Sequence, residues 1–470
     1  MFNIQRRIRL FTLVRNAPNF ADRTLKPEWV FVALALVAGL CMVFVTGPFQ
    51  APDEFNHFSR AYQISEGQFL GERADGRAGG WLPEGIINAR VAFAGVAFHP
   101  KVKIQSKVMK RLWREPFDAN RKVFYGFPNT VLYFPLCYLP QALGIAAGRL
   151  YGLSALEMMY AGRFLSLLCW TGVLWAAIRL TPVFKWVMVL MGLMPMALFL
   201  AASLSADTMI NASSIVLVAI VLRAKFGGEK LSWGTGVLMG GLCLAISIMK
   251  FVYCPLALLI LLIPWEWYGG RKQKIAYCSG VIGAACFAVL LWGMETKAIY
   301  VPLNDSNISE QLSLILANPW RYTVVLWNTI CAQWWVWIIS FTGVLGWLDT
   351  RLPQWIEYSY LLVLIEASLL DVGNGRSFRI WERSAMTVFC FLCWLLIATA
   401  QYLTWSKVGA DVVEGLQQGR YLIPLAVPAL LVLRNRVTAG QDTKFFAGAV
   451  TVYATVVLFT TCFRIYGRYY

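Results

Sequence analysis

The sequence predicts an all-α integral membrane protein with about eleven transmembrane helices. Of its 470 residues, 58% are hydrophobic and only 14% are charged, whereas soluble domains carry about 25% charged residues. Most hydrophobic residues are concentrated in blocks of roughly 17–25 residues, the length that crosses a bilayer as a helix. Basic residues lie mainly in short segments between these blocks, as is typical of cytoplasmic loops.

Thirteen hydrophobic blocks follow one another along the chain. They comprise residues 29–47, 129–149, 158–178, 184–203, 208–222, 233–249, 252–267, 275–294, 321–342, 355–370, 385–404, 421–433 and 445–463. If all thirteen crossed and the N-terminus were cytoplasmic, the basic segments 179–185, 223–230 and 271–274 would lie outside. Leaving 129–149 and 321–342 out of the crossing set places all the short basic loops in the cytoplasm. We therefore prefer eleven crossing helices over thirteen.

The two blocks left out have features that suit helices lying against the outer face of the membrane. The first contains Pro135 and Pro140, and proline interrupts helical hydrogen bonding. The second contains four tryptophans, and tryptophan prefers the membrane interface. We expect both blocks to form juxtamembrane structure on the extracytoplasmic side.

This topology predicts one transmembrane domain over residues 29–463. A basic amphipathic segment, 1–28, would precede it in the cytoplasm, and a short tail, 464–470, would follow it. Two extracytoplasmic regions, 48–157 and 295–353, would interrupt the domain. The sequence does not define an oligomeric state.

The net charge of +17 does not predict nucleic-acid binding, because the basic residues are distributed as membrane topology requires. The outer segment 101–122 is also rich in Lys and Arg. It could contact lipid phosphates or an anionic glycan, or it could be a solvated surface. The eleven cysteines lie almost entirely in hydrophobic blocks, so no disulfide framework is visible.

Two adjacent acidic residues, Asp53 and Glu54, follow the first hydrophobic block and Pro52. A helix that begins there would place His57 one turn further along, followed by Arg60. The two carboxylates and the histidine could bind a divalent cation, such as Mg²⁺ or Mn²⁺, or one carboxylate could be a general base. Alternatively, the acids only complement the positive N-terminus of a helix.

A further acid, Asp207, lies between two hydrophobic blocks in the segment Ser203–Asn211. It could cap a helix, or it could face Asp53 across a site. Three cations are expected on the same outer face, namely Arg163, Lys250 and Arg420. They could extend toward lipid headgroups or bind a phosphate.

Neighbouring polar and aromatic residues extend this candidate substrate site. The residues in question are Tyr253, Gln418 and Tyr421, beside the two later cations, and Trp347 and Asp349 in the segment 341–353. An aromatic ring can stack on a sugar and a carboxylate can accept from its hydroxyls, so Trp347 and Asp349 suit carbohydrate. A structural turn would explain the same pair.

Several motifs together resemble those of a bacterial family of predicted membrane proteins without an assigned function. They are Pro52-Asp-Glu-x-x-His57-Phe-x-Arg60-Ala-Tyr-Gln-Ile-Ser65, Ser203-Leu-Ser-Ala-Asp207, Lys250-x-x-Tyr253-x-Pro255-Leu256, Gly343-Val-Leu-Gly-Trp-Leu-Asp-Thr350 and Gln418-Gly-Arg-Tyr421-x-x-Pro424. That family resembles the GT-C glycosyltransferases. The resemblance implies a multi-helix fold, a polyprenyl-phosphate sugar donor, and an acidic residue in the first outer loop, which Asp53 matches. Asp207 resembles a second acidic position of that fold.

We therefore expect a glycosyltransferase that modifies a cell-envelope glycan or lipid-linked acceptor outside the bacterial cytoplasmic membrane. Asp53 would be the base, with Glu54 and His57 orienting the acceptor or binding a cation, and Asp207 would complete the catalytic set. A lipid-linked glycan flippase is an alternative, but ionisable residues gather at one face rather than along a path through the bilayer. A non-catalytic component of a polysaccharide assembly complex is another alternative.

Overall fold

The computed structural model of the protein describes residues 25–228, 230–371, 377–434 and 443–470. The expected amphipathic segment 1–28 therefore lies largely outside the described residues. The first half contains α2 (Pro27–Val45), α3 (Glu54–Ser65), α4 (Glu84–Phe93), α5 (Ser106–Trp113), α6 (Leu139–Leu150), α7 (Ala155–Leu180), α8 (Lys185–Leu193), α9 (Pro195–Ala201) and α10 (Asp207–Phe226). The second half contains α11 (Trp233–Met249), α12 (Arg271–Thr296), α13 (Ile308–Ala317), α14 (Pro319–Gly343), α15 (Gln354–Leu370), α16 (Ile380–Thr404), α17 (Ile423–Leu433) and α18 (Thr443–Tyr469).

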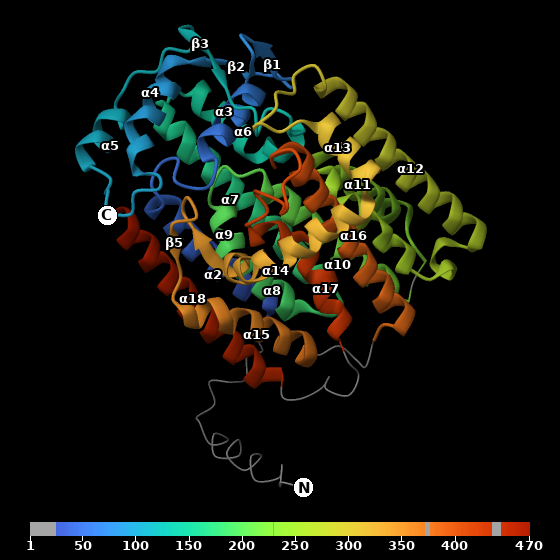
Figure 1. Ribbon diagram of the computed structural model, residues 1–470. Helices are drawn as coiled ribbons and strands as arrows, with labels where there is room; N and C mark the ends of the chain where they lie inside the picture. The colour runs from blue at the N-terminus through green and yellow to red at the C-terminus, as the bar shows by residue number, and fades with distance from the viewer. Residues whose placement is uncertain (1–24, 229, 372–376, 435–442) are drawn as a thin grey trace, which may run out of the picture.

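The molecule is a helical bundle with most of its irregular structure and strands at one end (Figure 1). Seven of the helices described are long and apolar enough to cross a membrane, namely α2, α7, α10, α12, α14, α16 and α18. Helix α7 is central, because it packs against α2, α6 and α10. The chain is thus a largely helical protein with several candidate membrane spans, as its composition predicts.

Several hydrophobic blocks are not the continuous helices that their length suggests. The block 184–203 is divided into α8 and α9 at Pro195, and proline removes a helical N–H donor. The block 252–267 forms two 3₁₀ helices, η5 (Phe251–Leu262) and η6 (Trp265–Tyr268). The block 421–433 begins in another, η7 (Gly419–Leu422), before α17. The sequence therefore predicts apolar segments better than it predicts helical continuity.

The two blocks with an expected juxtamembrane role differ from each other. Residues 129–149 form an irregular segment, a short 3₁₀ helix η4 (Pro135–Tyr138) and the 12-residue helix α6. Residues 321–342 form one continuous 25-residue helix, α14. The segment 464–470, expected as a short tail, continues α18 through Tyr469, and the backbone N–H of Ile104 donates to the Tyr469 carbonyl.

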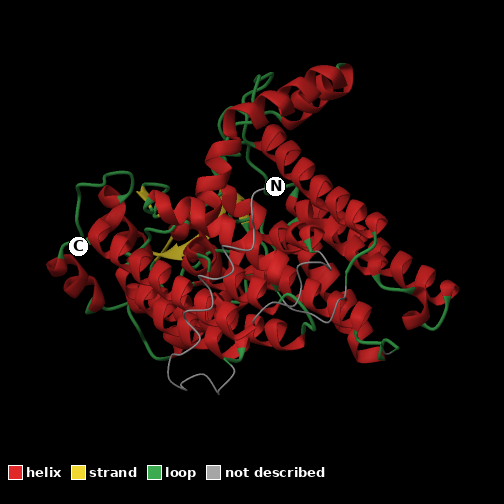
Figure 2. Cartoon of the chain, turned by 90° about the horizontal axis from the view of Figure 1, so that it is seen from below, coloured by secondary structure: helices red, strands yellow, loops and turns green. Residues whose placement is uncertain are grey.

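Two small antiparallel sheets interrupt the predicted all-helical fold. The region 48–157, which we expect on the extracytoplasmic side, holds β1 (Glu72–Ala74), β2 (Arg77–Pro83) and β3 (Lys122–Gly126) in the order β1-β2-β3. A Cβ atom at Gly79 of β2 would lie 1.9 Å from the Tyr125 carbonyl oxygen of β3, so only glycine fits there. The second sheet pairs β4 (Val344–Leu345) with β5 (Thr350–Arg351). The strands form a small part of the molecule (Figure 2).

Candidate functional site

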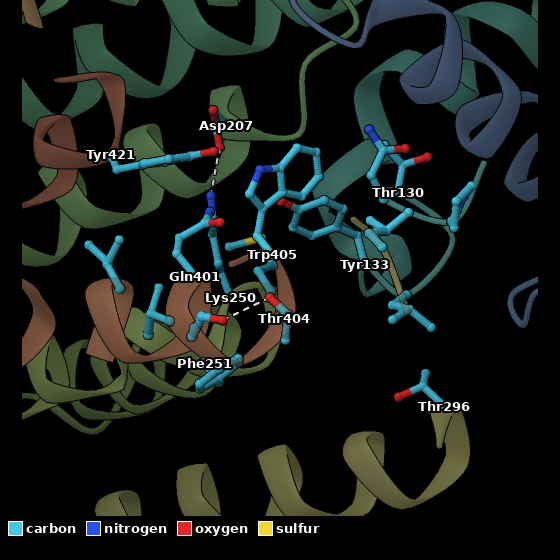
Figure 3. A pocket seen from close by; sticks show the side chains of 18 of the residues that line it. Thr130, Tyr133, Asp207, Lys250, Phe251, Thr296, Gln401, Thr404, Trp405 and Tyr421 are labelled. Atoms are coloured by element: carbon cyan, nitrogen blue, oxygen red, sulfur yellow. Dashed lines mark hydrogen bonds and ion pairs between the residues drawn. The ribbon is translucent and has the colours of Figure 1, made fainter. Parts of the chain in front are cut away.

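A cavity of about 470 Å³ brings together residues from distant parts of the chain. The charged groups that line it are Asp53, Asp207, Lys250 and Arg420, with His57 beside them. In Figure 3 the Lys250 side chain points toward Asp207, while Tyr421, Trp405 and Tyr133 surround the pair. Two acids and two cations, separated by up to 367 positions between Asp53 and Arg420, therefore meet at one site.

Asp53 lies at the N-terminus of α3 and its carboxylate is partly accessible. Its backbone has a φ of 55°, in the left-handed region that Asp tolerates better than most residues. The Asn129 side-chain amide donates to Asp53 Oδ1 at 3.0 Å, and Arg420 Nη2 lies 3.9 Å from Asp53 Oδ2. With 36% of its side chain exposed, Asp53 can still reach a molecule in the cavity.

Asp207 is the first residue of α10 and follows a tight serine-rich turn. The Ser205 hydroxyl accepts from the Asp207 backbone N–H at 3.2 Å, and the Ser203 hydroxyl accepts from the N–H of Ser205. The Asp207 carboxylate lies 3.3 Å from Lys250 Nζ and 3.8 Å from Arg420 Nε. Asp207 thus has two cationic partners and only 12% of its side chain is exposed.

Lys250 and Arg420 are placed at the ends of two broken helices. Lys250 has an extended backbone between α11 and η5, and its ammonium group lies 4.5 Å from the centre of the Tyr421 ring. Arg420 belongs to η7 and is 6% exposed. Its Nε and Nη1 atoms are buried without a hydrogen-bond partner among the described residues. These donors are the strongest local indication of an anionic ligand, because buried polar groups are normally hydrogen-bonded.

His57 lies on the first turn of α3 and faces the charged cluster. Its Nδ1 atom is 2.7 Å from the Tyr138 hydroxyl. Burial lowers the pKa of His57 to about 4, although the nearby carboxylates of Asp53 and Asp207 act in the opposite direction. The imidazole is therefore neutral near pH 7, and it can orient a polar group more readily than it can offset negative charge.

Glu54, predicted as a catalytic residue, is fully buried and does not line the cavity. Arg163 donates to both of its oxygens, with 2.7 Å between Nε and Oε1 and 2.5 Å between Nη2 and Oε2. The same guanidinium donates to the carbonyls of Val43, Thr46 and Gly47 at the end of α2. The expected substrate contact of Arg163 is therefore not seen, because the pair joins α2, α3 and α7.

Arg60, a predicted substrate residue, lies outside the cavity, and its guanidinium donates to Gln63, to the Phe69 carbonyl and to the Tyr133 carbonyl. Tyr253 also lies outside the lining, and its hydroxyl donates to the Tyr421 carbonyl at 2.9 Å. Both residues support elements that carry lining residues, rather than facing the cavity themselves.

The predicted carbohydrate pair, Trp347 and Asp349, is also outside the cavity. The Trp347 indole donates to the Phe49 carbonyl at 3.0 Å. The Asp349 carboxylate accepts from Arg468 at 2.7 Å and from the Thr350 hydroxyl at 3.0 Å. These contacts favour the structural turn that the sequence left open as the alternative.

Gln418 and Tyr421 do line the cavity, as expected, but other lining residues were not identified from the sequence. Asn129 is the most informative of these, because it connects Asp53 to Asn56, whose side-chain amide donates to Asn129 Oδ1 at 2.7 Å. Its position in Pro128-Asn129-Thr130, among outer-face residues, was the only sequence signal. Trp405 and Tyr133 add aromatic rings to the wall.

The donor set does not fit a dedicated divalent-cation site. Glu54, expected to share a metal with Asp53, is bound to Arg163. Asp53 and Asp207 both lie near Arg420, whose charge opposes that of a metal ion. Within residues 25–228, 230–371, 377–434 and 443–470, no group of three or more His, Cys, Asp and Glu side chains is arranged to hold a metal.

Most of the remaining wall of the cavity is apolar, although Ser247, Thr296, Gln401 and Thr404 add polar groups to it. Ile248 and Phe251 contribute from α11 and η5, Val289 and Trp292 from α12, and Ile397 from α16. Helix α12 leaves most of its surface exposed, as a lipid-facing helix would. The cavity therefore joins a charged end to an apolar side.

The sequence comparisons show the family to which the chain belongs. The model of a family described as predicted membrane protein (DUF2142) matches residues 36–429. No curated protein and no solved structure matches the chain. Because the match covers most of the chain, this protein is a member of the DUF2142 family of predicted membrane proteins.

Proposed function

We propose that the protein is a membrane glycosyltransferase that takes a sugar from a polyprenyl-phosphate donor and adds it to a glycan or lipid-linked acceptor. The observation that carries the proposal is the two-part cavity, in which paired acids and cations adjoin an apolar wall. The sugar phosphate would occupy the charged end and the prenyl chain the apolar side. The resemblance to GT-C glycosyltransferases points to the same chemistry.

Asp53 is the best candidate for the catalytic base. It is the more exposed of the two carboxylates in the cavity, at 36% against 12% for Asp207. The oxygen of an acceptor hydroxyl would form a bond to the anomeric carbon, while its proton passes to Asp53. The bond from the anomeric carbon to the phosphate oxygen would break, and the lipid phosphate would leave with the electron pair. Attack opposite the leaving group inverts the anomeric centre.

Arg420 and Lys250 are suited to the departing phosphate. The buried Nε and Nη1 atoms of Arg420 donate no hydrogen bond to another described residue, although Nε lies 3.8 Å from the Asp207 carboxylate, and a phosphate would provide acceptors. Lys250 adds a point charge, and its contact with Asp207 fixes its position. Such groups lower the barrier by stabilising the charge that develops as the phosphate leaves. In this arrangement Asp207 positions the two cations.

The location of the reaction follows from the proposed topology, with eleven crossing helices and a cytoplasmic N-terminus in the bacterial inner membrane. Helix α14 is long enough to cross, but its hydrogen bonds support a position along the outer face. Arg321, near its start, donates to the Gly409 carbonyl, Gln333 to that of Val413, and Ser340, near its end, accepts from the Gly419 N–H. Helix α14 thus follows the segment 405–420, which we place outside.

Purified Asp53→Asn protein tests the proposed base. With polyprenyl-phosphate sugars as donors, we expect release of polyprenyl phosphate to fall about 10²- to 10⁴-fold, since a general base contributes that much. Donor binding should persist, and the exposed Asp118→Asn control should keep wild-type turnover. Unchanged turnover in Asp53→Asn would exclude this base. Donor movement across the bilayer without loss of sugar would indicate the flippase alternative.

The purified Arg420→Ala variant tests the proposed contact between Arg420 and the phosphate of the donor. We expect donor binding to weaken about 10- to 100-fold, the equivalent of losing charge-assisted hydrogen bonds. Arg321→Ala removes an arginine whose side chain is 54% exposed outside the cavity and provides the matched control. Equal donor affinity in Arg420→Ala and wild type would contradict the proposed phosphate site.

A further inference from the structure

The segment 101–114 in the outer region is strongly cationic and independent of the cavity. It contains Lys101, Lys103, Lys107, Lys110, Arg111 and Arg114, and no acidic residue. All six side chains belong to exposed residues. Apart from Lys103, whose ammonium group donates to the Gly467 and Arg468 carbonyls, none of these six side chains has a hydrogen bond or ion pair to another described residue. We call Lys107, Lys110, Arg111 and Arg114 the α5 cationic face.

Helix α5 separates these cations from its apolar residues. Leu112 is buried, and Val108 and Met109 are half-buried against the protein. At 100° per residue these three residues share one side of the helix, while the α5 cationic face occupies the opposite side. The helix is therefore fixed to the protein by its apolar side and presents its charges outward.

Two sets of contacts place this segment at the outer ends of candidate membrane helices. Ile104 donates its backbone N–H to the Tyr469 carbonyl at 2.8 Å, at the end of α18. At the other end of the segment, the Trp113 ring lies 5.4 Å from that of Tyr160 near the start of α7. Figure 1 shows α5 beside the C-terminal end of α18.

Aromatic residues give the depth of the segment relative to a bilayer. The Tyr160 ring stacks on Phe44 at 5.7 Å, and Phe44, the second-last residue of α2, is 58% exposed. Trp113 is 41% exposed beside them. Trp and Tyr concentrate where hydrocarbon meets the headgroups, so the cluster of Trp113, Tyr160 and Phe44 is typical of an interfacial aromatic belt.

We infer that the α5 cationic face binds anionic lipid headgroups of the outer leaflet. Lys110 and Arg114 lie nearest to the Trp113 edge of the helix. Arg111 and Arg114 also line a cleft against α4, in which Glu115 is the one acidic residue among the described lining and has no ion pair with either arginine. Headgroup phosphates supply the negative charge that these exposed cations lack within the protein. A basic segment held at the membrane surface attracts anionic lipid in this way.

Lipid retention by the full chain in nanodiscs of equal phosphatidylglycerol and phosphatidylcholine tests the inference. We expect native mass spectrometry to find phosphatidylglycerol enriched on wild-type protein. The enrichment should fall about fivefold in Lys107→Gln/Lys110→Gln/Arg114→Gln, and it should also fall with added salt, as surface attraction does. The variant Arg73→Gln/Arg77→Gln/Arg121→Gln removes three exposed cations around the outer sheet and should retain the wild-type lipid ratio.

Folding is monitored separately, because both triple variants should retain the wild-type unfolding midpoint in neutral detergent. A wild-type lipid ratio in the α5 variant would overturn the inference, as would an equal loss in the control variant. Binding of a soluble polyanionic glycan that disappears in the α5 variant, with lipid ratios unchanged, would assign the surface to glycan instead. None of these outcomes depends on glycosyl transfer.

Discussion

Asp53 and Glu54 are neighbours in the chain, but their carboxylates have different surroundings. Asp53 borders the cavity, with Asn129 as its hydrogen-bond partner, whereas Glu54 is enclosed with Arg163. Asp53 has a left-handed backbone just before α3, whereas Glu54 is the first helical residue, so the two side chains leave the chain in different directions. At the scale of single residues, the orientation of the side chain decides which of the two acids borders the cavity and which is enclosed in an ion pair.

His57 provides a pH test at the same scale. Its folded-state pKa of about 4 lies below the ordinary value of 6.5, so below pH 6.5 the unfolded chain binds a proton that the folded protein does not. The free energy of unfolding is therefore higher above pH 6.5 and falls as the pH decreases toward 4. The difference due to His57 is about 3 kcal/mol. In detergent, His57→Gln should lose this part of the pH dependence of unfolding. His99→Gln, at the exposed second histidine, should keep it.

At the scale of elements, the neighbouring ends of three helices are joined by one buried ion pair. Arg163 of α7 binds Glu54 of α3 and the last carbonyls of α2. This arrangement fixes the start of α3, and so fixes Asp53 beside the cavity. The interruptions of helical structure at Pro195 and before Arg420 also position residues at the cavity, because they leave the short elements α9 and η7 around the charged cluster.

Glu54→Gln should destabilise the protein by about 3–5 kcal/mol, because it leaves the Arg163 charge buried without its partner. A second change, Arg163→Met, should recover much of that loss. Thermal unfolding in detergent measures both effects, and Asp118→Asn serves as the exposed control. A Glu54→Gln protein of unchanged stability but without activity would instead restore Glu54 as a catalytic residue.

At the scale of the whole molecule, the side of the membrane on which each helix ends decides where the charged end and the apolar wall of the cavity lie. Charged cavity residues come from α3, α10, α11 and η7. They share one face only if neither 129–149 nor 321–342 crosses the membrane and reverses the direction of the chain. The proposed eleven-helix topology therefore determines the side of the membrane on which the reaction would occur.

Labelling in a cysteine-free background tests this topology. A membrane-impermeant maleimide should reach Ala317→Cys and Gln354→Cys, which flank α14 and its turn, from outside the cell. Lys272→Cys, at the start of α12, should react only after the membrane is permeabilised. Protection of either α14-flanking position in intact cells would mean that α14 crosses the membrane.

The sequence by itself determined the membrane class, because hydrophobic length and basic loops are local properties that need no tertiary contacts. It also identified Asp53, Asp207, Lys250 and Arg420, since polar residues at the ends of apolar blocks stand out. Only the tertiary structure decided which polar residues meet. Arg163 and Glu54 are 109 positions apart, and no sequence pattern shows that they neutralise each other while Arg420 keeps donors free. Packing encloses the Glu54–Arg163 pair away from the cavity and brings Asp53, Asp207, Lys250 and Arg420 together at its wall.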